Sequence, residues 1–403
     1  MNTIASAISK RYIEALVDEL DISDARYEQA NDSYNSLGQW LNRPHSTIAA
    51  YSPAVYVQGS FGLGTVIKPV NLEEEYDIDA VCELKKLNKT QLTQQRLKEM
   101  VGLEIEAYRK SKNMTKPLRE GRRCWTLNYA DGAQFHMDVV PSLPNGIEVR
   151  QLLEARKFDT RWATTAVAIT DNERANYRSY SNDWPRSNPK GYIEWFESRT
   201  LVVLNERKRA LAKSLNASVE QIPDYRVRTP LQAAIMILKR HRDMMFEKDQ
   251  TNCCPISIII TTLAAHAYNS EEDIADALYS ILTNMERFIE RDADRRAIIR
   301  NPSDAMENFA DKWAEFPERE RSFYTWLRQA REDFSRIAAM DNRKMITETL
   351  SPHLGVELAK RAENRAGSGA GPLLRGATGA SAGAAAPSFG AVPRVPSKPK
   401  GFG

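Results

Sequence analysis

The chain has 403 residues, which is too long for one minimal domain and fits two packed lobes with a tail. Its 42% hydrophobic and 27% charged residues are ordinary for a soluble enzyme, and a net charge of +3 gives no reason to expect strong binding to long nucleic acid. No stretch approaches the uninterrupted apolar run that crosses a bilayer, and the N-terminus lacks the core of a signal peptide. We therefore expect a cytoplasmic protein with no membrane partner.

Helical periodicity opens the chain and then gives way to strand-like runs. Apolar residues recur at roughly helical spacing over 3–20 and again over 25–41. Short β-rich runs bounded by Gly, Pro, Asp or Asn follow at 54–58, 78–84, 124–129 and 134–140. A helical stretch at about 93–110 separates the second run from the third. Asp131-Gly132 is a strong turn signal, so the last two runs are predicted to form a hairpin.

The second half of the chain reads as mainly helical. Helical segments are predicted near 231–246, 256–268, 274–289 and 319–340. After Glu363 the sequence has no acidic residue and is dominated by Gly, Ala, Ser and Pro, a composition typical of a mobile tail.

These patterns predict an α+β fold. The expected organisation is a pair of N-terminal helices packing on both lobes (1–50), a mixed α/β core (51–200), a helical lobe (201–363) and a flexible Gly/Ala/Pro-rich tail (364–403).

Three aspartates carry the clearest chemical signal. Alternate side chains of a strand share a face, so Asp77 and Asp79 should point the same way while Ile78 and Ala80 point into the core. Asp138 comes from a later strand. Three carboxylates that converge from adjacent strands repel one another unless a cation lies among them, and hard oxygen ligands suit Mg²⁺ or Mn²⁺. The pattern predicts a two-metal site for phosphoryl or nucleotidyl transfer.

Gly59-Ser60 is predicted to supply the phosphate-binding half of this site. A glycine lets the backbone approach phosphate oxygens, and amides with a hydroxyl at a following helix start can surround them. A Gly-Ser pair alone is typical of many turns. The order Gly-Ser, then Asp-x-Asp on a strand, then one Asp on a hairpin strand is far more specific.

The motifs together resemble a known family. Gln58-Gly59-Ser60, Asp77-Ile-Asp79 and Asp138-Val-Val-Pro141 resemble the nucleotidyltransferase superfamily that includes DNA polymerase β. The closer likeness is to the bacterial cGAS/DncV-like nucleotidyltransferases, or CD-NTases. It runs from about Val57 to Tyr268 and includes the segments 187–196, 229–243 and 255–263.

The resemblance implies a polymerase-β-like core closed by a helical lobe. It also implies an enzyme that joins nucleoside triphosphates, ATP or GTP or both, into a cyclic di- or trinucleotide that activates an antiphage effector, using two Mg²⁺ ions for which Mn²⁺ can substitute. By the same resemblance, Gln58, Lys239 and Ser257 contact the nucleotide together with Gly59 and Ser60. Without the family resemblance, Lys239 would be interpreted as a solvated helix lysine and Ser257 as a capping or core hydroxyl.

The remaining polar features receive simpler interpretations. His136 shares a strand face with Asp138, and we expect it to make a local hydrogen bond. All four cysteines, Cys82, Cys124, Cys253 and Cys254, are predicted to be reduced thiols. The adjacent Cys253 and Cys254 resemble part of the zinc-binding insertion of the animal DNA sensor, but the matching His and third Cys are missing, so neither zinc binding nor activation by DNA is expected.

Two alternatives stay open at this stage. The first is another enzyme of the same fold, such as a tRNA-tailing or small-molecule nucleotidyltransferase. The second is a catalytically inactive nucleotide-binding scaffold, against which the complete set of carboxylates and Gly59-Ser60 argues.

The chain ends in Gly403, after a segment that lacks acidic residues. Glycine has no side chain to obstruct attack on its carboxylate, so such a terminus can enter a narrow enzyme channel. In the resembling family, members with this kind of C-terminus are joined covalently to other molecules by a partner similar to fused ubiquitin-activating and ubiquitin-conjugating enzymes. Gly403 is therefore the predicted conjugation point.

Overall fold

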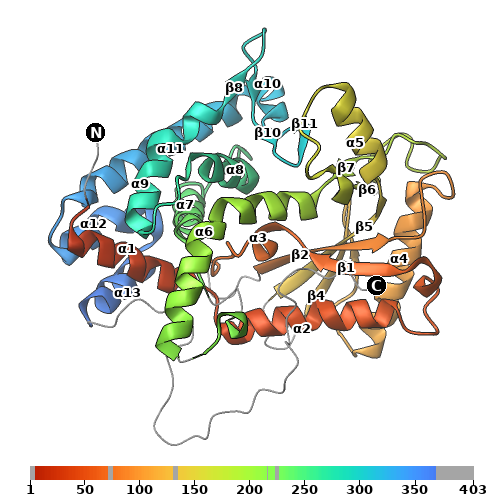
Figure 1. The fold of residues 1–403 in the computed structure, drawn as a ribbon, viewed down its shortest axis with the longest axis horizontal. Coiled ribbons are helices and arrows are strands. Elements are labelled where there is room, and N and C mark those ends of the chain that lie inside the picture. Colours follow the sequence, from red (N-terminus) through yellow and green to blue (C-terminus); the bar gives the residue numbers. More distant parts are fainter. Residues whose placement is uncertain (1–4, 71–75, 130–134, 216, 223–226, 369–403) are drawn as a thin grey trace, which may run out of the picture.

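A computed structural model describes residues 5–70, 76–129, 135–215, 217–222 and 227–368, and shows a lobe built on a sheet beside a helical lobe (Figure 1). The elements of the first lobe are β1 (Pro53–Val57), α3 (Gly59–Gly62), β2 (Tyr76–Leu84), α4 (Gln94–Ser111), β3 (Arg119–Glu120), β4 (Trp125–Tyr129), β5 (Phe135–Pro144), α5 (Gly146–Ala155), β6 (Val167–Ile169) and β7 (Arg186–Ser187). The predicted mixed α/β core is confirmed.

The sheet has the order β1-β2-β5-β4-β3, and β6 and β7 extend it beyond β5. Its pairing is mixed: β2 and β5 run parallel, whereas β1 pairs with β2 and β4 with β5 in antiparallel fashion. The β4–β5 pair confirms the predicted hairpin partners, although the turn residues Asp131 and Gly132 lie outside the described residues.

One face of the sheet forms the core of this lobe. Ile78, Ala80, Met137 and Val139 are fully buried there and pack in one cluster with side chains of α4 and of α2 (Asp24–Leu41). Both helices begin where a side-chain oxygen caps the backbone, as Thr93 does for Arg96 N–H at 3.1 Å. Because strand residues alternate in direction, the opposite face of β2 and β5 presents the polar residues.

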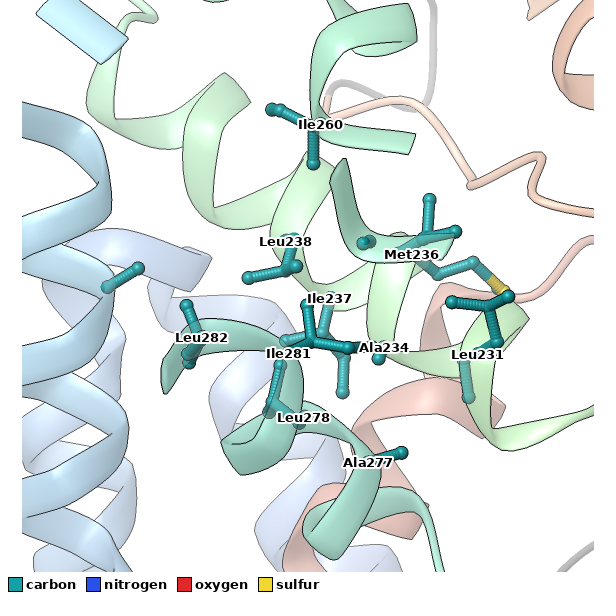
Figure 2. Packing of buried hydrophobic residues seen from close by; sticks show 14 of the residues in the cluster. Leu231, Ala234, Met236, Ile237, Leu238, Ile260, Ala277, Leu278, Ile281 and Leu282 are labelled. Carbon is teal, nitrogen blue, oxygen red and sulfur yellow. The ribbon is translucent and has the colours of Figure 1, made fainter. Parts of the chain in front are cut away.

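The helical lobe is centred on α7 (Pro230–Met245), whose side chains from Pro230 to His241 are nearly all buried. A capping box between Thr229 and Gln232 begins this helix. Figure 2 shows its Leu231, Met236 and Leu238 packing beside residues of α8 and α9. The surrounding helices are α8 (Ser257–Ala267), α9 (Ile274–Asn284), α10 (Asp311–Glu315), α11 (Pro317–Ala338), α12 (Arg343–Leu354) and α13 (Val356–Gly367).

The sequence patterns do not predict some elements of this half of the chain. The strands β8 (Glu290–Arg291), β9 (Ala297–Ile298), β10 (Arg300–Asn301) and β11 (Asp304–Asn308) form two small antiparallel pairs. The 27-residue helix α6 (Pro189–Leu215) connects the sheet to the helical lobe (Figure 1) and runs through the domain boundary expected at residue 200. Its buried residues concentrate in the first turns, while Leu201 and Val202 are exposed, so no continuous apolar stripe marks it.

The two N-terminal helices pack on different lobes. The helix α1 (Ala7–Leu20) contributes Tyr12, Ile13 and Leu16 to the core of the helical lobe, whereas α2 covers the sheet. Near the other end, α13 continues to Gly367 and buries Ala366, beyond the tail boundary expected at 364. Within the described ranges, no helix combines the length and the apolar character needed to span a membrane.

Candidate active site

The parallel register of β2 and β5 brings the predicted carboxylates together. Asp79 lies directly opposite Asp138, and Asp77 lies opposite His136. Asp77 is exposed and the other two aspartates are partly buried, while the neighbouring Ile78 is fully buried. The prediction that three carboxylates from adjacent strands share one face is confirmed by this register.

The surroundings of Asp79 disfavour its charged form. Burial, followed by the charges of Asp138 and Asp77, raises the pKa of Asp79 to about 6, although His136 and Lys239 act in the opposite direction. The outer carboxylates contact neighbours: Thr126 Oγ1 donates to Asp138 Oδ1 at 2.6 Å, and His136 Nε2 lies 3.0 Å from Asp77 Oδ1. His136 thus makes the local contact expected of it. A divalent cation would relieve the repulsion at Asp79.

Asp79→Asn should therefore stabilise the metal-free protein. The pKa of Asp79 is about 6 in the folded state against an ordinary 3.8, so the charged carboxylate destabilises the folded protein above pH 6 and has no such effect once protonated below about pH 4. The variant should gain about 1–3 kcal/mol in EDTA at pH 8, and the gain should vanish on acidification. Thermal unfolding measures it. Asp159→Asn, on an exposed aspartate, is the control, and an equal gain there or a gain that persists at pH 4 would contradict the assignment.

The Gly59-Ser60 turn directly abuts this carboxylate. Gly59 starts α3 immediately after β1, and Gln58 N–H donates to the backbone oxygen of Asp79 at 2.8 Å. A Cβ added at Gly59 would lie 2.2 Å from Asp79 Oδ2, and φ at this residue is +59°. Only glycine fits this approach without displacing the carboxylate. The structure thus places the predicted phosphate-binding turn beside the predicted metal ligand.

Residues of α7, and Arg228 just before it, hold the segment that follows this turn. Gln232 Nε2 donates to Leu63 O and Lys239 Nζ to Thr65 O, both at 2.9 Å. Arg228 and Arg240 donate to the backbone oxygens of Gly64 and Lys68. The helical lobe therefore fixes the chain on the far side of α3.

Lys239 lies within electrostatic range of the carboxylates. It is 7% exposed, and burial, followed by the charge of Arg242, lowers its pKa to about 8, while Asp79 and Asp77 raise it. The amine thus carries its charge at neutral pH and can present it to a phosphate. Its buried position excludes the interpretation as a solvated helix lysine.

Ser257 begins α8 and is positioned by a residue that the motifs did not single out. Arg242 Nη1 donates to Ser257 Oγ at 2.7 Å and to Pro255 O at 3.0 Å, and Arg242 Nε donates to Asp243 at 2.8 Å. Arg242 falls inside the segment 229–243 that carries the family resemblance, yet the sequence holds no signal that separates it from the other basic residues there.

Lys239→Ala should weaken triphosphate binding more than metal binding. Loss of one charged contact costs about 1.5–3 kcal/mol, or roughly tenfold to a hundredfold in affinity. Titration with a non-hydrolysable triphosphate measures the effect, and Lys248→Ala, on an exposed lysine after α7, is the matched control. Unchanged affinity in Lys239→Ala would remove the residue from the nucleotide site. Ser257→Ala should show a smaller loss of the same kind, since a neutral contact is weaker.

Comparison with known proteins supports a nucleotidyltransferase. Residues 53–141, which include β1, α3, β2 and β5 up to Pro141, match the family model of the nucleotidyltransferase domain described as cyclic GMP-AMP synthase DncV-like. The chain is 29% identical over 316 residues to a c-di-GMP synthase of Roseivirga ehrenbergii, an alignment that covers 77% of this chain and 75% of the relative. It is 26% identical over 319 residues to the cyclic dinucleotide synthase CdnG of Bradyrhizobium diazoefficiens, covering 75% and 70%.

Solved structures show the same fold. The B. diazoefficiens CD-NTase CdnG in complex with GTP matches with a TM-score of 0.65 at 19% identity, covering 89% of this chain and 99% of that one. The chain is therefore similar to cyclic dinucleotide synthases over most of its length and has the fold of a CD-NTase. The dinucleotide cyclase DncV of Vibrio cholerae matches more distantly, with a TM-score of 0.56 at 12% identity. The match covers both lobes of the chain. Its four cysteines are free thiols, as expected.

Proposed function

We propose that this protein is a CD-NTase that condenses nucleoside triphosphates into a cyclic di- or trinucleotide with release of pyrophosphate. The observation that carries the proposal is the arrangement of Asp79 opposite Asp138 with Gly59 packed against the Asp79 carboxylate. Its similarity to a c-di-GMP synthase and to CdnG supports a cyclic product.

Asp77, Asp79 and Asp138 would hold two Mg²⁺ ions, for which Mn²⁺ can substitute. The residues fit such ions, since they offer carboxylate oxygens on one sheet face, and burial together with the charges of Asp138 and Asp77 raises the pKa of Asp79. When bound, two such ions stabilise the attacking and leaving oxygens of an in-line displacement.

The other residues would grip and orient the triphosphate. Gln58, Gly59 and Ser60 supply the turn next to Asp79, and Lys239 supplies a buried positive charge. Ser257, held by Arg242, supplies a hydroxyl at the start of α8. In each transfer a ribose hydroxyl oxygen bonds to the α-phosphorus of another nucleotide, the α–β phosphoanhydride breaks, pyrophosphate leaves and the hydroxyl proton passes to solvent. A last transfer onto the remaining 5′-triphosphate closes the ring.

Product analysis tests the proposal. The purified protein is incubated with Mg²⁺ and α-labelled ATP, GTP, CTP or UTP, singly and in combination, and the products are treated with phosphatase and separated by chromatography. We expect a labelled product that resists phosphatase, one pyrophosphate released per nucleotide incorporated into that product, and no product in EDTA. GTP alone and GTP with ATP are tested first, because the structures of B. diazoefficiens CdnG and V. cholerae DncV are complexes with GTP.

Two outcomes would support the alternatives. Label transferred to tRNA or to a small acceptor, without a phosphatase-resistant nucleotide, would indicate a tailing or small-molecule nucleotidyltransferase. Binding of triphosphates without pyrophosphate release would indicate an inactive scaffold. The proposed role of a cyclic product is to activate a downstream antiphage effector in the cytoplasm. Adding the product to that effector tests this role.

Removing the tail should separate synthesis from conjugation. Gly403 and all of 369–403 lie outside the described residues, and α13 buries Ala366, so the truncation is placed after Ser368. We propose that Gly403 is joined to other molecules by a ubiquitin-activating/conjugating-like partner. The truncated enzyme should keep its rate of synthesis within about twofold, because the described catalytic and core residues remain. It should form no thioester or amide adduct, as judged by mass spectrometry. An adduct on the truncated chain would contradict the assignment of Gly403.

A further inference from the structure

A second group of metal-ligating side chains lies inside the helical lobe. In the described part of the chain, His241, Asp333 and His353 each offer a ligand atom, and these atoms all lie within 4.8 Å of one another. The residues come from α7, α11 and α12. His241 Nε2 lies 3.0 Å and His353 Nδ1 2.6 Å from the same oxygen, Asp333 Oδ2.

The group does not belong to the candidate active site. Lys239 and His241 are two positions apart on α7, so their side chains leave the helix about 200° from each other. Lys239 reaches Thr65, next to the phosphate-binding turn, whereas His241 faces α11 and α12. No role in holding the triphosphate accounts for His241, Asp333 and His353.

Burial and ligand chemistry favour a cation at this position. His241 is fully buried, Asp333 is 2% exposed, and the rings of Trp326 and Phe334 lie 6.5 Å and 5.9 Å from the His241 ring. Burial lowers the pKa of His241, which leaves a neutral imidazole at pH 7. One carboxylate and two imidazoles form a ligand set of zinc.

The immediate surroundings suit ligation as well. Gln329 Nε2 donates to the second oxygen of Asp333 at 2.9 Å and so orients the carboxylate, as partners of metal ligands do. His241 Nδ1 is buried without a hydrogen-bond partner among the described residues, so this nitrogen is able to take the proton that Nε2 shares with Asp333 when Nε2 binds a metal. The side chain of His353 is 28% exposed and gives a path from solvent.

We propose that His241, Asp333 and His353 bind one Zn²⁺ ion that links α7 to α11 and α12. Tetrahedral zinc holds its nitrogen and oxygen ligands about 3.3 Å apart, so the observed separations of 2.6 Å and 3.0 Å require only a small outward movement. Binding displaces the protons of His241 Nε2 and His353 Nδ1, to the other ring nitrogens or to solvent, and water completes the coordination. This site uses no cysteine and is separate from the Cys253-Cys254 pair.

Zinc retention tests the proposal. The full-length Asp77→Asn/Asp79→Asn variant, which lacks two of the carboxylates of the candidate active site, is stripped with EDTA, loaded with Zn²⁺ and dialysed. We expect one Zn²⁺ per chain by atomic emission and a higher unfolding temperature than in the stripped protein. Adding His353→Gln should weaken zinc affinity at least about tenfold, and adding His45→Gln, on an exposed histidine, should leave it unchanged.

Two results would overturn the site. One is a stripped protein that takes up no zinc, which would make the group a metal-free hydrogen-bonded contact. The other is zinc that is retained equally in the His353→Gln protein, which would place the ion elsewhere. Because His353 is partly exposed, its replacement should leave the fold intact, and far-ultraviolet circular dichroism checks this.

Discussion

Replacing Asp77 and Asp79 together by asparagine is expected to lower product formation by at least about a thousandfold. Both side chains leave β2 on the face opposite the core, and Asp79 lies opposite Asp138 on β5. Asparagine keeps the shape but removes the charges that would hold the cations. Loss of about 4 kcal/mol of transition-state stabilisation corresponds to this factor. The measurement is pyrophosphate release at saturating Mg²⁺ and triphosphate.

The controls for this variant separate chemistry from folding. Asp159→Asn carries the same chemical change on an exposed residue and should retain full activity. Asp138→Asn should lose activity like the double variant. If the double variant formed product at the wild-type rate, the metal assignment of Asp77 and Asp79 would be wrong.

Gly59→Ala is expected to lower activity by about a hundredfold with a smaller effect on folding. The new Cβ would lie 2.2 Å from Asp79 Oδ2, so the carboxylate must move, and a displacement of about 1 Å at a reacting centre costs this much. The left-handed φ of +59° adds about 1 kcal/mol of backbone strain. Steady-state kinetics and thermal unfolding give the two effects.

Gly62→Ala is the matched control, three residues further along the same helical turn. Its Cβ would meet the flexible end of Ile193, 2.7 Å away, and φ there is not left-handed, so the side chain can yield. Gly62→Ala should keep activity within about tenfold. Equal losses in both variants would show that the turn tolerates neither substitution for structural reasons, and the special role of Gly59 would be rejected.

The sheet and its aspartates could be predicted because their signals are local. Alternation over 78–84 and 134–140 places Ile78 and Met137 inside, which fixes the direction of Asp79 and Asp138 on the same strands. The parallel register that sets Asp79 against Asp138 depends on the crossover through α4 and the hairpin, so the sequence could indicate convergence but not the pairing itself.

The contacts between distant segments could not be predicted. Helix α6 carries no continuous apolar stripe because Leu201 and Val202, at its middle, are exposed. The role of Arg242 depends on where α8 begins, and the group of His241, Asp333 and His353 joins residues as far as 112 positions apart along the chain. No local pattern encodes such contacts.

Manganese binding followed by electron paramagnetic resonance tests whether Asp77, Asp79 and Asp138 hold two metal ions. Mn²⁺ is titrated into the wild-type protein and the Asp77→Asn/Asp79→Asn variant at pH 8, each with a saturating non-hydrolysable GTP analogue and in a His353→Gln background that removes the second proposed site. We expect two bound Mn²⁺ ions per chain when all three carboxylates are present and loss of protein-held Mn²⁺ in the variant. Equal Mn²⁺ binding by both proteins would contradict the assignment of Asp77 and Asp79 as metal ligands.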